Sequence, residues 1–148
     1  MFEYQTISVS NPLDKNPNLQ QWFESSASKI LNTLNYLSLV FCTDAFILEL
    51  NNSALSHNYY TDIITFDLSD SDSEIDAEIY ISIDRVEENS KKFGVTFVHE
   101  LARVMIHGVL HLAGNSDKTP NQQEAMREKE NYFLQDLKMF HVEPKNEE

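Results

Sequence analysis

The chain has 148 residues, of which 41% are hydrophobic and 24% charged, a composition that suits one globular domain and excludes two large ones. Eleven basic and 24 acidic residues give a net charge of −13, which argues against broad electrostatic adhesion to nucleic acid or anionic membranes and leaves only a local basic patch. A chain of this length can bury a core without metal or disulfide staples, so we expect any bound metal to serve function.

Cysteine content and hydropathy favour a cytoplasmic protein. The one cysteine, Cys42, lies in the apolar run 39–42 and cannot form an internal disulfide, so we expect a small buried side chain in a reducing compartment. The first basic residue is Lys15, so the N-terminus lacks the pattern of a signal peptide. The longest uncharged run, 30–43, has 14 residues, fewer than the about 20 apolar residues of a membrane-spanning helix.

The N-terminal part of the chain predicts alternating strands and helices. Segment 2–9 is rich in β-forming residues and predicts a strand that ends at Asn-Pro turns. Apolar residues recur at every third or fourth position over 19–37, which predicts a helix with one buried face. A strand over 39–42 follows, and Thr43 or Asp44 then caps a short helix.

Two further strands are predicted over 63–66 and 79–83, and an acidic segment separates them. Residues 67–78 include six acidic side chains, which raises the question of calcium. If Asp70 opened an EF-hand loop, Ile75 would stand where that loop requires glycine, so we interpret the segment as a solvated hairpin connection.

Three helices are predicted in the C-terminal part. Asp84 can cap a helix over 85–93, a second helix runs over 95–113, and a third begins at Pro120. The second is apolar around almost its whole circumference, which is typical of a helix in the centre of a core.

The polar residues of the second helix form one stripe. At about 100° per residue, Glu100, Arg103 and His111 lie within about 40° of His107, and His99 lies about 80° away. Because the rest of the helix is apolar, this stripe must face something polar.

The spacing of two histidines and an aspartate predicts a metal site. His107 and His111 are four residues apart on one side of a helix, so both imidazoles reach one ion. Gly114 can end the helix, and the chain then presents Asp117 as a third ligand, which leaves a fourth position for water. The alternative is a pair of buried histidines and an unrelated loop aspartate. We favour one Zn²⁺ per chain.

The other polar residues of the stripe have two interpretations each. His99 lies about 12 Å along the helix from His107, too far to share its ion, so we assign it to the cleft wall or to a satisfied core site. Glu100 and Arg103 form either an ion pair on the helix face or, since Arg103 lies one turn from His107, part of a phosphate site. Arg103 is therefore our candidate catalytic residue.

A metallopeptidase is disfavoured. Zinc proteases of the H-E-x-x-H type use the glutamate as general base, and here Gly108 follows the first metal histidine. The pair of His99 and Glu100 continues to Arg103 and not to a second histidine.

Segment 107–117, H-G-V-L-H-L-A-G-N-S-D, resembles the signature of the YbeY family of bacterial endoribonucleases, which act in ribosomal RNA maturation. The resemblance extends upstream through 61–66 and 77–82 and downstream to 124–126, so that it covers most of the chain in order. It implies zinc binding by the two histidines and a third ligand six residues after the second. That ligand is usually histidine in the family and is Asp117 here.

The resemblance also identifies departures. Asn115 and Ser116 stand where the family has tyrosine and aspartate, and the family's arginine after the short helix falls at Leu55. Leu55 and the net charge of −13 favour an alternative function, a non-catalytic metal-binding factor in ribosome assembly.

These observations lead to one set of expectations. The fold class is α/β (α+β), a small mixed four-stranded sheet packed with helices around the buried histidine helix. Residues 1–142 form one domain and 143–148 a frayed tail. The resemblance implies a single-strand-specific, metal-dependent endoribonuclease that matures the 3′ end of small-subunit (16S) ribosomal RNA in the cytoplasm, with ribosomal RNA and the small subunit as partners and no membrane or DNA.

Overall fold

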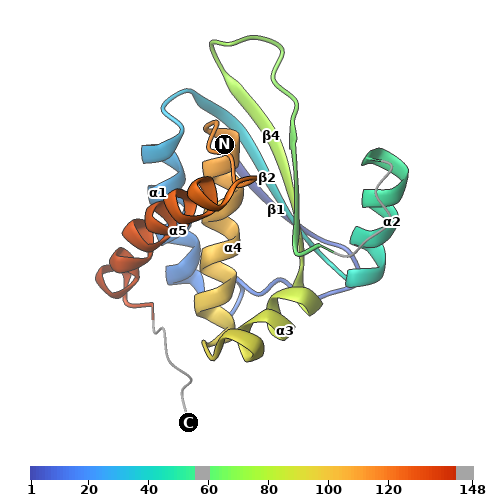
Figure 1. Cartoon of the computed structure of the whole chain (residues 1–148), viewed down its shortest axis with the longest axis vertical. Helices are drawn as coiled ribbons and strands as arrows, with labels where there is room; N and C mark the ends of the chain where they lie inside the picture. The colour runs from blue at the N-terminus through green and yellow to red at the C-terminus, as the bar shows by residue number, and fades with distance from the viewer. Residues whose placement is uncertain (56–60, 143–148) are drawn as a thin grey trace.

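The computed structural model describes residues 1–55 and 61–142, so the predicted tail at 143–148 lies outside the described residues (Figure 1). Four strands form one sheet in the order β1-β2-β4-β3. They are β1 (Phe2–Thr6), β2 (Leu34–Cys42), β3 (Ile63–Asp67) and β4 (Ile75–Ser82). The central strands β2 and β4 are parallel, β1 is parallel to β2, and the edge strand β3 is antiparallel to β4. The predicted mixed four-stranded sheet is confirmed.

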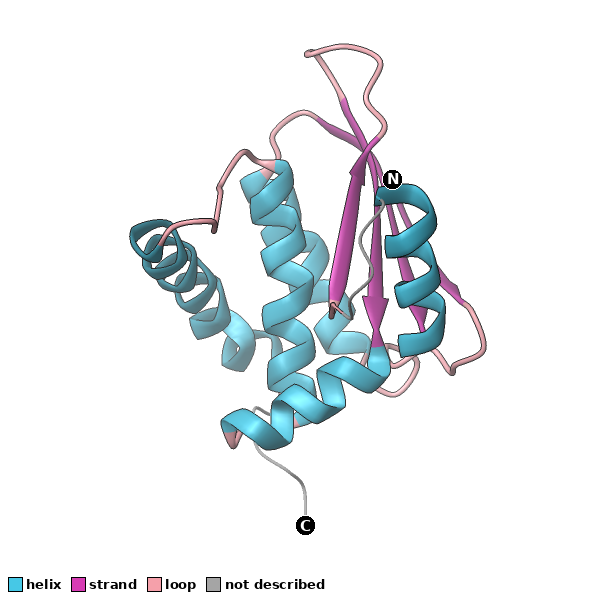
Figure 2. Cartoon of the chain, turned by 45° about the vertical axis from the view of Figure 1, so that its right-hand side comes forward, coloured by secondary structure: helices cyan, strands magenta, loops and turns pink. Residues whose placement is uncertain are grey.

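Helices cover both faces of this sheet, and Figure 2 shows α2 on one side with α4 and α5 on the other. The helices are α1 (Pro17–Ile30), α2 (Asp44–Leu55), α3 (Ile83–Phe93), α4 (Phe97–Leu112) and α5 (Pro120–Leu134), and the 3-10 helix Gln135–Phe140 follows. No single helix among the described residues is long and apolar enough to cross a membrane; α3 and α4 meet that test only as a pair, bent by 117°.

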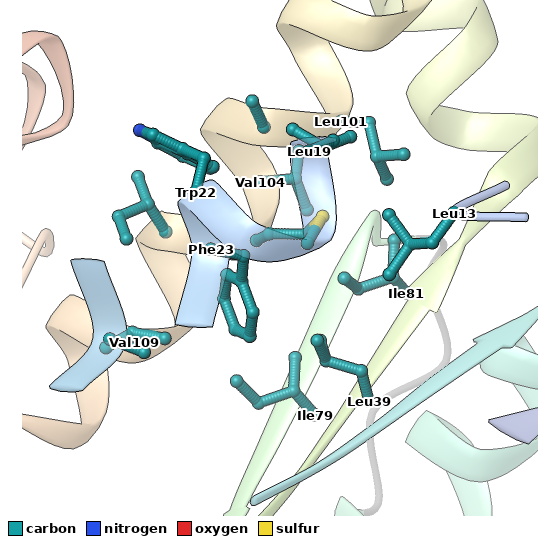
Figure 3. Packing of buried hydrophobic residues seen from close by; sticks show 14 of the residues in the cluster. Leu13, Leu19, Trp22, Phe23, Leu39, Ile79, Ile81, Leu101, Val104 and Val109 are labelled. Atoms are coloured by element: carbon teal, nitrogen blue, oxygen red, sulfur yellow. The ribbon is translucent and has the colours of Figure 1, made fainter. Parts of the chain in front are cut away.

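The main core lies between the sheet and helices α1 and α4 (Figure 3). Leu39, Ile79 and Ile81 point from the strands towards Phe23 of α1, and all four side chains are completely buried. At about 25 cal/mol per Å² of apolar surface, the burial of this cluster is the main force that holds α1 and α4 against the sheet. On the other face a small cluster contains Cys42, Ile47 of α2 and Ile64. Cys42 is buried as expected, and burial raises the pKa of its thiol to about 12.

The predicted helix over 19–37 is wrong beyond Ile30. The helix α1 ends at Ile30, and β2 begins at Leu34, five residues earlier than the predicted strand. The spacing of Ile30, Leu31 and Leu34 matches a helix by coincidence. Residues after Leu34 lie between two parallel neighbours, β1 and β4, whose backbone groups satisfy theirs, so pairing across the sheet outweighs local periodicity.

Several boundaries also differ. The first strand ends at Thr6 and not at residue 9, because Ser8 takes a left-handed conformation with φ 60°. The strand β4 begins at Ile75, so it includes residues that we assigned to the acidic connection. The helix α3 begins at Ile83 and its cap is Ser82, since Asp84 instead accepts a hydrogen bond from the backbone of α2.

Candidate metal centre

Helix α4 carries the predicted metal histidines into the centre of the molecule. Thr96 caps its start by accepting a hydrogen bond from the backbone of His99. Gly108 lets α4 lie directly against the sheet, because a Cβ there would come within 2.8 Å of Ile63 and 3.0 Å of Ile79. Gly108 stands where zinc proteases of the H-E-x-x-H type have their glutamate, and the close packing requires glycine at this position. After α4, Gly114 takes φ 99° and turns the chain back towards the histidines.

The structure brings the three predicted ligands together. Asp117 places Oδ2 3.3 Å from Nε2 of His107 and Oδ1 3.3 Å from Nε2 of His111. The donor atoms of the three residues all lie within 4.8 Å of one another, and each side chain is partly exposed.

These residues fit a zinc ion. Zinc takes nitrogen and oxygen ligands at about 2.0–2.2 Å in a tetrahedron. Nε2 of His107 faces Oδ2 of Asp117 and Nε2 of His111 faces Oδ1, so the three side chains present donor atoms to one point. Two imidazoles and one carboxylate also leave the fourth position open, which is typical of a catalytic and not of a structural zinc site.

Glu130 of α5, a residue that the sequence did not single out, holds His107 in place. Its Oε2 lies 2.6 Å from Nδ1 of His107, so that nitrogen donates and Nε2 keeps its lone pair for the metal. Glu130 is only 4% exposed. A signal was present: Met126, Glu130 and Leu134 recur every four residues along α5 and all three are buried. An acidic residue on the buried face of a helix indicates a partner.

Arg103 contacts this same glutamate. Its guanidinium donates to Oε1 of Glu130 at 2.8 Å and to Oδ1 of Asn131 at 3.1 Å. The ion pair that the structure shows for Arg103 is thus with a distant helix and not with Glu100, the partner that helical spacing suggested. Arg103, Glu130 and His107 form a continuous chain of hydrogen bonds that ends at the metal centre.

Within this chain of hydrogen bonds, the pKa values of Glu130 and His107 depend on each other. Burial raises the pKa of Glu130, but hydrogen bonds from His107 and Arg103 outweigh burial and bring it below its ordinary value. Burial lowers the pKa of His107, but the hydrogen bond to Glu130 and the charges of Glu130 and Asp117 raise it above its ordinary value. Glu130 is therefore a carboxylate, and it makes the imidazole a stronger base and a better ligand.

A cavity of about 370 Å³ opens beside the metal centre. Its walls come from β3 and from helices α3, α4 and α5, and its lining includes His107, Asp117, Arg103 and Arg127. Asp62, Glu100 and Glu130 also line it. Burial raises the pKa of Asp62, and it raises the pKa of Glu100 to about 7.

Two further predicted positions lie outside the metal centre. His99 is partly buried at the start of α4, and burial together with Arg103 lowers its pKa, in agreement with its assignment away from the ion. Leu55 is 40% exposed at the end of α2, a helix that lies on the face of the sheet opposite α4 (Figure 2). It is not among the described residues that line the cavity.

Comparison with known proteins identifies one family over most of the chain. The profile of a family described as Endoribonuclease YbeY matches residues 5–138. The chain is 41% identical over 131 residues to an Endoribonuclease YbeY of Bacteroides thetaiotaomicron, covering 88% of this chain and 95% of that one. It is 43% identical over 116 residues to an Endoribonuclease YbeY of Cytophaga hutchinsonii, covering 78% and 81%.

A solved structure shares the fold. The solution structure of TM1509 from Thermotoga maritima superposes with a TM-score of 0.67 at 28% identity, covering 93% of this chain and 89% of that one. The family match spans most of the chain, including the three predicted ligands and Glu130. This chain belongs to the YbeY family of endoribonucleases.

Proposed function

We propose that this protein is a zinc-dependent endoribonuclease that cleaves single-stranded RNA, with one ion per chain held by His107, His111 and Asp117. The observation that carries the proposal is the convergence of these three side chains, of which His107 and Asp117 line a cavity, in a chain of an endoribonuclease family. A bound zinc ion would supply Lewis-acid activation of a water molecule and of a phosphoryl oxygen.

The side chains of the protein orient the site. Glu130 accepts the Nδ1 proton of His107 and so directs Nε2 towards Asp117. Arg103 holds the other oxygen of Glu130 and lines the cavity. We propose that Arg103 also contacts the RNA phosphate as a catalytic residue, since a guanidinium has five donors and two of its nitrogens have protein partners here.

We propose that the substrate is the 3′ end of small-subunit (16S) ribosomal RNA. We further propose that the protein acts in the cytoplasm and that residues 1–142 form a single domain. Three arguments support a single-stranded RNA. The family relatives are named as endoribonucleases. A net charge of −13 repels a duplex over a wide surface. The cavity instead offers cations at only a few points, which suits a locally bound strand.

A second candidate, a metal-binding ribosome-assembly factor without catalysis, is favoured by one observation. The family's arginine is replaced by Leu55, and that position lies outside the described cavity lining.

An RNA-cleavage assay on one preparation of known zinc content separates the candidates. We expect cleavage of single-stranded RNA that disappears after metal removal, returns with zinc and is absent in His107→Ala. Zinc binding and small-subunit binding without cleavage would instead support the assembly factor.

The role of Arg103 needs its own variant. If Arg103 contacts phosphate, Arg103→Ala loses cleavage far more than zinc content. If it serves only the pair with Glu130, the melting temperature falls while activity per folded molecule is kept.

A further inference from the structure

One aromatic side chain lies exposed in the wall of the cavity. Phe93, the last residue of α3, is 52% exposed although it lines the same cavity as His107 and Asp117. What distinguishes Phe93 from the other exposed apolar residues is this position, which offers an apolar ring face to whatever occupies the cavity.

A polar side chain accompanies this ring. Asn89 lies four residues before Phe93 on α3, so both project from one face of the helix, and both line the cavity. Within the described part of the chain the Asn89 side chain makes no hydrogen bond, although it is partly buried. An amide beside an aromatic ring is the combination that reads an unpaired base, since the ring stacks on the base and the amide bonds its edge.

Cations flank the same wall. Lys92 places its ammonium 5.8 Å from the centre of the Phe93 ring, and Arg127 faces the cavity from α5. Neither forms an ion pair with any residue in the described ranges 1–55 and 61–142. In a protein of net charge −13 they are available to phosphate.

The distance from this wall to the metal centre suits neighbouring nucleotides. The cavity extends along α4 from Glu100 to His107, seven residues or about 10.5 Å along the helix axis. Phe93 precedes α4 by only a few residues and lines the cavity together with Glu100. One strand can thus hold a phosphate at the metal centre and a nearby base at the ring.

We propose that Phe93 and Asn89 form a base-binding subsite for single-stranded RNA, in which an unpaired base stacks on the Phe93 ring while Arg127 and Lys92 contact the adjoining phosphates. The inference rests on the proposed RNA-cleaving function and deepens it. It explains selection for single strands, because a base within a duplex has no free face to offer the ring.

Phe93→Ala tests the stacking contact. Loss of one base–aromatic stack should raise the KM or Kd for a single-stranded oligoribonucleotide by about 5- to 150-fold. Zinc content and melting temperature should not change, because the ring is largely exposed. Phe93→Trp should restore binding. Tyr132→Ala is the matched control, since Tyr132 is 65% exposed on α5 but does not line the cavity among the described residues.

An abasic series supplies the second test. Each oligoribonucleotide in the series lacks one base. At one position, removal of the base should weaken binding to wild type but should not weaken binding to Phe93→Ala any further. Asn89→Ala should change the preference among bases at that same position.

Three outcomes would overturn the inference. Equal effects of Phe93→Ala and Tyr132→Ala, with wild type cleaving RNA, would reject the subsite and leave the proposed function intact. A changed oligomeric state in Phe93→Ala at constant RNA affinity would assign the ring to a protein interface. A wild-type protein that neither binds nor cleaves RNA would reject both proposals.

Discussion

Removing the carboxylate of Glu130 should lower both the unfolding free energy and the zinc affinity, and the two losses can be measured separately. In Glu130→Ala the guanidinium of Arg103, whose side chain is 14% exposed, loses its partner at 2.8 Å. Breaking one side of a buried ion pair costs about 3–5 kcal/mol of unfolding free energy. The same change frees the Nδ1 of His107, which lies 2.6 Å from Glu130. Loss of such an outer contact lowers metal affinity about 10- to 100-fold, or about 1.4–2.7 kcal/mol.

Two measurements separate these effects. Urea unfolding of the metal-free protein gives the stability loss, and zinc titration against a chelating indicator, at a temperature where the variant is folded, gives the affinity. Glu130→Gln should fall between wild type and alanine, since an amide oxygen accepts one of the two hydrogen bonds but carries no charge. Glu128→Ala on the same helix is the control, because Glu128 is exposed and we expect a change within about 0.5 kcal/mol.

The reasoning would be refuted by unchanged zinc affinity in a folded Glu130→Ala. That result would mean that Glu130 only joins α4 to α5. Unchanged stability together with unchanged affinity would refute the ion pair as well.

Three further predictions concern the ligands and their surroundings. Asp117→His should keep zinc binding because imidazole can replace a carboxylate in a zinc site, and Asp117→Ala should weaken it; equal titrations of the two variants would remove Asp117 from the ligands. Since burial raises the pKa of Glu100 to about 7, its folded form holds a proton that the unfolded form releases, so stability falls as pH rises towards 7. Glu100→Gln should therefore gain stability over wild type at pH 8 but not near pH 4, by at most about 3 kcal/mol in urea unfolding of metal-free protein; a difference independent of pH would contradict this. Gly108→Val should lower the unfolding free energy by about 3 kcal/mol, because its side chain would overlap Ile63 and Ile79; a thermal melt like that of wild type would contradict the close packing.

Local chemistry in the sequence was sufficient to predict which three side chains come together at the candidate metal centre. A spacing of four residues sets two side chains on one side of a helix wherever that helix lies, so His107 and His111 face one point. Gly114 then allows the left-handed turn that returns Asp117 to them, and its φ of 99° agrees with that requirement. The near-continuous apolar surface of α4 likewise predicted a central helix, and nine of its residues are buried.

Local periodicity did not predict the boundary between α1 and β2, because pairing within the sheet determines where that strand begins. The predicted helix ran on through residues 34–37, which belong to β2 because their backbone pairs with β4 and, from Leu37, also with β1. The cap of α3 is a similar case. Asp84 and Ser82 can both cap a helix. The Asp84 carboxylate instead accepts a hydrogen bond from the backbone N–H of Asp44, 40 positions away in the chain, so Ser82 forms the cap.

The tertiary structure alone decided the partners of the polar stripe. Helical spacing placed Arg103 beside Glu100, but the packing of α5 against α4 brings Glu130, 27 positions away, to its guanidinium. The packing of α3 against α4 likewise brings Phe93 into the wall of the cavity. A sequence determines what each helix presents on its faces, because that follows from a fixed repeat of the backbone. Which face meets which depends on the burial of apolar surface summed over the whole chain, and no single segment contains that information.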